Sequence, residues 1–196
     1  MRKPTQIEAF EALLRTRLAP FIQKTFLTVS PGAEYSHNWH IDLIAEYLEA
    51  CTNGDISRLI INIPPRSLKS ISVNVAWPAW LLGKDPQRRI LSASYSGTLS
   101  LKHSVDTRLV MQTDWYRRLF PSVQMSEDQD TKGKCVTTER GFRLATSVGG
   151  SSTGEGGNFL IVDDPHSPKQ MESELKRQRA LDWFDQTYTS RLDDKK

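Results

Sequence analysis

The chain has 196 residues, of which 38% are hydrophobic and 25% are charged, and its formal net charge is +3. These values exclude wholesale disorder and suit one well-buried α/β core rather than two domains. The charges are interspersed along the chain, which permits a nucleic-acid partner without indicating one. Cys51 and Cys135 form no CxxC pair and have no histidine at metal-ligand spacing, so neither a zinc site nor a disulfide framework is expected.

Helical patterns fill the first part of the chain. Apolar residues recur at three- and four-residue spacing from residue 5 to residue 28, which predicts a helix interrupted near Pro20. A second helix follows, which Asn38 caps and Gly54 ends. We therefore expect residues 1–57 to form an N-terminal helical segment that leads into the main core.

The next part alternates between strand and helix patterns. The apolar run over residues 59–63 predicts a buried strand, and a helix is expected from Lys69 to about Leu82. Residues 89–95 predict a second buried strand, which a helix follows from Gly97 towards Gln112. This succession is typical of a parallel sheet covered by helices on both faces.

Shorter elements are expected after Gln112. A short helix lies around Trp115, and a polar stretch over residues 126–134 is expected to be a mobile loop. Residues 136–138 and 142–146 form the pattern of a β-hairpin. A glycine-rich segment, residues 149–157, then leads into a further apolar strand.

That strand ends in two carboxylates, Asp163 and Asp164, and a final helical pattern runs from Met171 to Leu192. A phosphate-binding enzyme needs an acidic residue at the end of an apolar strand to hold magnesium and to polarise the attacking water. Asp163 suits the metal and Asp164 suits the water. The alternative is that the pair caps the following helix, because Asp164 before Pro165 is also a helix-start signal.

The segment before Lys69 has the chemistry of a phosphate loop. It reads PPRSLKS over residues 64–70, and its Lys-Ser pair matches the end of the P-loop, or Walker A, pattern. In that pattern, backbone N–H groups and a lysine hold phosphates, and a hydroxyl ligates magnesium. Ile63 and Leu68 occupy the positions of the two usual glycines. The loop and the acidic strand end, the counterpart of a Walker B segment, together predict nucleotide binding.

These residues resemble the large terminase subunit of tailed phages and prophages. Motifs similar to those of the family occur in the family's order and span most of the chain from Asn38 to Leu192. They are Asn38-Trp39-His40, the loop segment INIPPRSLKS over residues 61–70, Ala79-Trp80-Leu81-Leu82-Gly83, Ala93-Ser94-Tyr95-Ser96, Trp115-Tyr116 with Leu119-Phe120-Pro121, Thr153-Gly154 with Gly156-Gly157, and Val162-Asp163-Asp164-Pro165. The loop without glycines is itself a variant found in that family.

The resemblance implies an α/β fold of the RecA-like P-loop NTPase class (ASCE type), with a mainly parallel sheet flanked by helices, in residues 58–196. It implies an ATP hydrolase that couples Mg-ATP hydrolysis to packaging of viral DNA into the capsid. ATP and Mg2+ are the implied cofactors. The nucleotide-binding residues that it implies are Pro65, Arg66, Ser67, Leu68, Lys69, Ser70, Trp39 and His40.

The resemblance also implies a role for each charged residue. Lys69 binds the β- and γ-phosphates, Arg66 stabilises the γ-phosphate, and Asp164 is the catalytic carboxylate. Ser70 ligates the metal directly, and Asp163 ligates it through water. Arg66 has a second interpretation, as a solvated loop charge.

Three further segments have open interpretations. In one interpretation, Trp39 and His40 surround the adenine base. In the other, Trp39 anchors the core behind a helix cap formed by Asn38. Ser94, Tyr95 and Ser96 follow a strand at the sheet edge where ligands gather, and they either contact DNA or cap a helix. The glycine-rich loop is either a nucleotide sensor or a plain connection. Many relatives carry an arginine where this chain has Glu155, so an arginine acting on a neighbouring subunit's nucleotide is missing here.

The implied partners are double-stranded viral DNA, the portal protein and the small terminase subunit, with the chain in a homo-oligomeric ring. No window approaches the roughly 20 apolar residues of a membrane span, and no signal peptide is recognisable, so we expect the bacterial host cytoplasm. Family members continue into a further strand, a coupling motif and an RNase H-like nuclease domain. We expect this chain to lack them, as a trimmed domain or the product of a shortened prophage gene, and not to cut DNA.

Two rival functions are carried forward. The first is a prophage remnant that binds nucleotide or packaging partners without turnover, which the early stop and Glu155 suggest. The second is an unrelated DNA-dependent ATPase such as a helicase, which shares the two nucleotide motifs.

Overall fold

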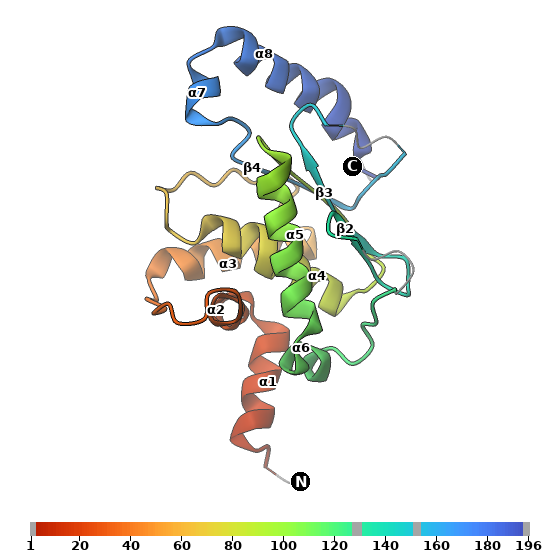
Figure 1. The fold of residues 1–196 in the computed structure, drawn as a ribbon. Coiled ribbons are helices and arrows are strands. Elements are labelled where there is room, and N and C mark those ends of the chain that lie inside the picture. Colours follow the sequence, from red (N-terminus) through yellow and green to blue (C-terminus); the bar gives the residue numbers. More distant parts are fainter. Residues whose placement is uncertain (1–2, 127–130, 151–153, 194–196) are drawn as a thin grey trace. The chain divides into compact units, whose positions relative to one another are not determined.

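A computed structural model describes residues 3–126, 131–150 and 154–193 of the chain. The chain divides into two compact units, one comprising Met1–Asp85 with Asp106–Val123 and the other Pro86–Val105 with Gln124–Lys196. Helix α5 (Gly97–Gln112) contributes residues to both. The expected division after residue 57 follows neither boundary and stays a prediction. Figure 1 labels the elements along the chain, and we describe each unit by itself.

Helices make up the first unit. They are α1 (Gln6–Thr16), α2 (Leu18–Val29), α3 (Trp39–Asn53), α4 (Trp77–Lys84) and α6 (Asp114–Leu119), with a π-helical segment at Ile71–Ala76. Helix α3 lies between Asn38 and Gly54 as predicted, but Asn38 makes no side-chain cap hydrogen bond. Gly54 follows the helix at a φ of 86°, a conformation that glycine adopts without strain. The predicted interruption near Pro20 is confirmed: α1 ends at Thr16, the chain is extended at Arg17, and α2 begins at Leu18. Pro20 lies in the first turn of α2, where a missing N–H removes no helical hydrogen bond.

Aromatic side chains fill the core of this unit around Phe21. Its ring lies 5.4 Å from that of Trp115 and 6.2 Å from that of Phe120, centroid to centroid. The polar tips of the other large rings are satisfied: Trp80 donates to the carbonyl of Leu14 at 3.1 Å, and the Tyr116 hydroxyl donates to the carbonyl of Ala79 at 2.8 Å. This packing holds the helical segment that begins at the phosphate loop.

Pro78 alters the hydrogen bonding of that helical segment. A proline has no N–H, and its ring crowds the carbonyl four residues earlier, here that of Asn74. The π-helical turn Ile71–Ala76 immediately precedes α4, and the Thr107 hydroxyl donates to the Asn74 carbonyl at 3.2 Å. The helical segment thus has a π turn before Pro78, with a side-chain donor in place of the missing N–H.

The second unit contains a four-stranded mixed sheet in the order β2-β3-β1-β4. Its strands are β1 (Arg89–Ser94), β2 (Lys134–Val136), β3 (Phe142–Ser147) and β4 (Phe159–Asp163). Strand β1 pairs in parallel with β3 and β4, and β2 pairs antiparallel with β3 as the predicted hairpin. The α/β class is confirmed, as are the strands predicted at β1 and β4.

The C-terminal residues form helices α7 (Pro168–Met171) and α8 (Glu174–Trp183), a π-helical turn at Phe184–Tyr188 and a 3-10 turn at Thr189–Arg191. The single helical pattern expected from Met171 is interrupted, because Ser173 is extended at φ −101° and ψ 114°. No helix in the described part of the chain is both long and apolar enough to cross a membrane.

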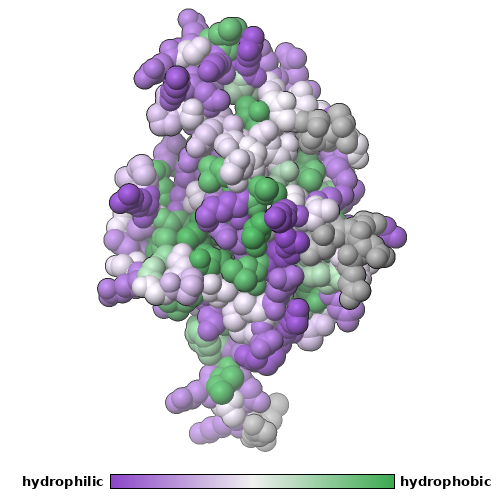
Figure 2. Space-filling model, in the orientation of Figure 1, coloured by the Kyte–Doolittle hydropathy of each residue, from purple (hydrophilic) through white to green (hydrophobic). Residues whose placement is uncertain are grey.

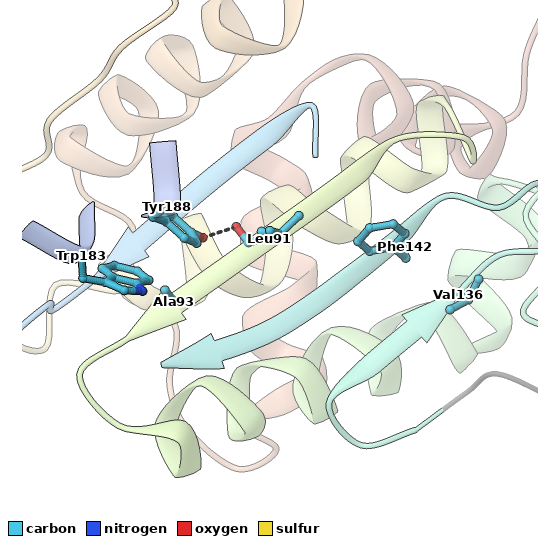
Figure 3. Packing of buried hydrophobic residues seen from close by; sticks show 6 residues of the cluster. All are labelled: Leu91, Ala93, Val136, Phe142, Trp183 and Tyr188. Atoms are coloured by element: carbon cyan, nitrogen blue, oxygen red, sulfur yellow. Dashed lines mark hydrogen bonds between the residues drawn. The ribbon is translucent and has the colours of Figure 1, made fainter. Parts of the chain in front are cut away.

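One face of the sheet carries the hydrophobic core of this unit. Figure 3 shows six of its residues, Leu91, Ala93, Val136, Phe142, Trp183 and Tyr188. The rings of Trp183 and Tyr188 stack with centroids 4.6 Å apart. The Tyr188 hydroxyl lies 2.9 Å from the carbonyl of Leu91 and 3.0 Å from that of Ile161, and it donates to them. Burial raises the pKa of this hydroxyl, an effect that the nearby charge of Arg143 partly opposes.

Replacing Tyr188 with phenylalanine is expected to lower the free energy of unfolding by about 1 kcal/mol, because two strand carbonyls lose a buried donor while the ring keeps its packing. Urea unfolding measures this change. The matched control is Tyr47→Phe, whose side chain is exposed on α3. Equal unfolding midpoints for the two variants would show that the Tyr188 hydroxyl contributes nothing.

The strand predicted over residues 59–63 is wrong. These residues belong to no strand, and the side chain of Ile60 is 86% exposed. Leu59, Ile61 and Ile63 are half-buried, so only alternate positions face the protein. A continuous apolar run predicts burial on both faces, but a strand also needs a hydrogen-bonding partner, which the run itself does not specify.

Candidate functional site

The phosphate loop is a turn followed directly by helix. Residues 65–66 form the turn, and helical conformation begins at Lys69. The carbonyl of Leu68 accepts the N–H of Ser72 at 2.9 Å, which closes the first helical turn. The N–H groups at the start of this helical segment have no earlier carbonyl to bond, which is the arrangement that binds phosphates in nucleotide enzymes.

Leu68 has the backbone conformation of the glycine that it replaces. Its φ is 60° and that of Arg66 is 65°, both in the left-handed region. A bulky residue there costs about 1–2 kcal/mol and persists only where the surroundings impose it, which occurs most often at functional sites. The missing glycine therefore does not remove the conformation that a phosphate loop requires.

The loop is accessible to solvent. Pro64, Pro65 and Arg66 are exposed, whereas Ser67, Leu68, Lys69 and Ser70 are half-buried. Lys69 and Ser70 thus lie next to each other at the start of the helical segment, where both are half-buried and remain partly accessible to solvent. Exposure of Arg66 leaves both of its interpretations in place.

The structure decides one question about Trp39. Its side chain is 71% exposed, so the interpretation as a core anchor is wrong. Asn38 precedes α3 but makes no side-chain cap hydrogen bond. The rings of Trp39 and His40 meet edge to face, 6.2 Å apart, and Nε2 of His40 is buried without a hydrogen-bond partner among the described residues. An exposed indole on a rigid helix start suits stacking on a flat ring.

In the second unit, β4 ends at Asp163 and places it beside Ser94. The register pairs Ser94 with Asp163, so the two side chains point to the same face of the sheet. Both residues are buried, and the Ser94 hydroxyl makes no hydrogen bond with any described residue. A buried hydroxyl without a partner calls for an explanation, and one is a ligand. Ser94 is therefore not a helix cap.

Asp164 differs from its neighbour. Its side chain is exposed, its φ is 47°, and its carbonyl accepts the N–H of Tyr95 at 3.0 Å. The cap of the next helix is Ser167, whose hydroxyl accepts the N–H of Gln170 at 3.3 Å. The alternative that Asp164 caps this helix is therefore wrong. The strand end presents one buried and one exposed carboxylate.

Mg2+ would have to be held here without a cluster of protein ligands. Among the described residues, no three histidine, cysteine or acidic side chains gather closely enough to hold a metal ion. Mg2+ does not require such a cage, because it is usually held by one or two carboxylates, waters and substrate phosphates. The hydroxyl and carboxylate oxygens of Ser70 and Asp163 are donors of the right chemistry. These two residues belong to different units, so each is assessed by itself.

No protein-family model matches this chain, and no curated protein sequence matches it.

Glu155 has a local partner that the sequence pattern did not reveal. Its carboxylate lies 2.5 Å from Nζ of Lys134, which also lies 4.4 Å from the centroid of the Phe142 ring. The negative charge is thus paired within its own unit. Residues 151–153 of the glycine-rich segment and residues 127–130 of the expected mobile loop lie outside the described residues.

Sequence reasoning also missed a buried polar layer on one face of the sheet. It includes Ser92, Ser94 and the fully buried Arg143, whose guanidinium donates to the Ser92 hydroxyl at 3.3 Å. The alternation of Arg143 with hydrophobic neighbours was the available signal, but arginine on a strand normally predicts the solvent face.

The conformation of Leu68 yields a prediction for the phosphate loop. Leu68→Gly is expected to retain Mg-ATP affinity, because glycine adopts a φ of 60° without strain. Leu68→Ile is expected to weaken it about tenfold, because a β-branched residue is a genuine outlier at positive φ. Calorimetric titration of both variants tests this, and equal affinities would mean that binding does not depend on this backbone conformation.

Proposed function

We propose that this chain is an ATPase domain of the kind found in the large terminase subunit, and that it binds and hydrolyses Mg-ATP. The observation that carries the proposal is the phosphate loop: Lys69 and Ser70 begin a helical segment directly after Leu68, which stands in the left-handed conformation. That conformation supplies the sharp turn that glycine usually provides. The RecA-like fold class is part of this proposal, because the mixed sheet is compatible with it.

Each residue has a role that its chemistry supports. The ammonium group of Lys69 and the backbone N–H groups after it bind the phosphates, and Arg66 adds a second positive charge. Ser70 in the first unit and Asp163 in the second are each an oxygen donor suited to Mg2+, which would neutralise phosphate charge when bound. The exposed carboxylate of Asp164 orients the attacking water and accepts its proton. Trp39 stacks on the adenine, with His40 behind it.

The wider assignments are proposals of the same standing. By its motifs, the chain would act on double-stranded viral DNA in a homo-oligomeric ring in the host cytoplasm, with the portal protein and the small terminase subunit as partners. Mg-ATP hydrolysis would then drive DNA packaging. Strand separation by the purified chain would instead favour a helicase.

A second candidate function is nucleotide binding without turnover. The observation that favours it is the segment before the phosphate loop: residues 59–63 belong to no strand, so the loop lacks the strand support that we expected. A loop held less rigidly positions phosphates less well for reaction than for binding.

Calorimetric titration of the chain with ATP tests the proposal. In the presence of Mg2+ we expect saturable binding with one site per chain, and we expect EDTA to weaken it, because a bound Mg2+ would neutralise part of the phosphate charge. AMP is the control, since it keeps the base and lacks the β- and γ-phosphates. Absence of binding, or equal affinity for ATP and AMP, would overturn the proposal. Phosphate release measured on the same sample separates turnover from binding alone.

A further inference from the structure

A cavity lies in the sheet unit, and two of its lining residues, Pro165 and His166, directly follow Asp164 in the chain. It has a volume of about 270 Å³ and lies beyond the carboxyl ends of three parallel strands. Tyr95 follows β1, Val148 and Gly149 follow β3, and Pro165 and His166 follow β4. The opposite wall is helical and consists of Gln170 from α7 with Lys176, Arg179 and Ala180 from α8. Open α/β sheets bind ligands at this edge.

Two permanent positive charges line the cavity. Lys176 and Arg179 are three residues apart on α8, and they therefore project from the same face as the buried Ala180. Neither forms an ion pair with an acidic side chain in the described ranges, and no acidic residue lines the cavity. The surface around α7 and α8 is largely hydrophilic in the view of Figure 2. The cavity thus concentrates positive charge that the protein itself does not neutralise.

His166 supplies an independent sign of a ligand. Its Nε2 atom is buried and has no hydrogen-bond partner among the described residues, although the side chain lines the cavity. Burying a ring nitrogen without a hydrogen-bond partner costs free energy, because the nitrogen gives up its hydrogen bond to water. A ligand that forms a hydrogen bond with this nitrogen offsets that cost. The adjacent wall is held in place, because the Tyr95 N–H donates to the carbonyl of Asp164 and Gln170 completes a capping box with Ser167.

We propose that this cavity binds a phosphate group. Its lining residues Lys176, Arg179, His166 and Tyr95 carry ammonium, guanidinium, imidazole and phenol groups, which are suitable partners for the oxygens of a phosphate. The volume is slightly below the range of about 300–1,000 Å³ typical of whole small-molecule sites, so it suits a phosphate with part of its sugar. The phosphate belongs either to a nucleic-acid backbone or to a free nucleotide or phosphate ion. This inference goes beyond the proposed ATPase function and does not depend on it.

The test uses the full chain carrying Lys69→Ala, so that the phosphate loop does not dominate binding. Into this background we introduce Lys176→Ala with Arg179→Ala, and separately His166→Phe. The charge-matched control is Lys132→Ala with Lys169→Ala, two exposed lysines of the same unit that do not line the cavity. Thermal unfolding of each variant shows that it is folded.

Calorimetry with inorganic phosphate and fluorescence anisotropy with a labelled double-stranded DNA are the two readouts. In whichever readout shows binding, we expect the cavity double variant to weaken it about tenfold, His166→Phe to weaken it less, and the control to change it little. If the chain binds DNA and inorganic phosphate competes poorly with that binding, the phosphate group belongs to a nucleic-acid backbone. If the chain binds inorganic phosphate alone, the group belongs to a free ligand. Equal weakening by both double variants, or no binding in either readout, overturns the proposal.

Discussion

Replacing Lys69 with alanine is expected to lower the affinity of the chain for Mg-ATP by about ten- to a hundredfold. The lysine is the first helical residue after the strained Leu68. At this position its ammonium group and the helix N–H groups would bind the same phosphate anion. A hydrogen bond to a charged group contributes about 1.5–3 kcal/mol, which gives this range of affinities. Calorimetric titration with Mg-ATP measures the change.

The control for Lys69→Ala is Lys84→Ala. It removes the same charge from the far end of the same helical region, where the ammonium group lies 4.1 Å from the centroid of the Trp80 ring. It should leave Mg-ATP affinity nearly unchanged, although the lost cation–π contact lowers stability slightly. An affinity that falls equally in both variants would indicate a general charge effect. An unchanged affinity in Lys69→Ala would remove the phosphate loop from the proposed site.

Replacing Asp164 with asparagine is expected to reduce phosphate release by about a hundredfold or more while leaving Mg-ATP affinity nearly unchanged. A general base contributes about 10²–10⁴ to a rate, and an amide cannot accept the proton of the attacking water. Asparagine is the appropriate substitution because Asp164 has a φ of 47°, a conformation that asparagine tolerates and alanine does not. The backbone hydrogen bond to Tyr95 should therefore persist.

Asp185→Asn serves as the matched control, because it changes an exposed carboxylate elsewhere in the same unit. Phosphate release is measured with and without double-stranded DNA, and binding is measured by calorimetry on the same variants. Turnover that survives Asp164→Asn would exclude this residue as the base. If the unaltered chain binds Mg-ATP without releasing phosphate, the second candidate function, binding without turnover, replaces the first.

The amino-acid sequence by itself determined the elements whose signals are local. Helix α3 lies between Asn38 and Gly54, and strands β1 and β4 lie where short apolar runs end at polar or turn residues. The β2–β3 hairpin and α5 were predictable for the same reason. Propensity, capping and turn chemistry act within a few residues, so they can be read without knowledge of the rest of the chain. The Lys-Ser pair of the phosphate loop and the two carboxylates after β4 were found in this way.

Only the tertiary structure decided features that depend on distant partners. Residues 59–63 look like a strand, yet a strand exists only if another backbone pairs with it, and no such pairing is specified by an apolar run. Tyr188 bonds carbonyls of β1 and β4 that lie 97 and 27 residues away in the chain, a contact without any periodic signature. The cavity at the sheet edge is likewise built from segments after three strands and from one face of α8.

The phosphate loop combines both kinds of information. Its residue types were evident from the sequence, but the sequence left Leu68 as a departure from the glycine pattern. The structure shows that Leu68 is in the left-handed region at a φ of 60°, between the turn at residues 65–66 and the helix that begins at Lys69. The side-chain chemistry of the loop is thus known from the sequence, whereas the strained backbone conformation at Leu68 depends on the folded structure.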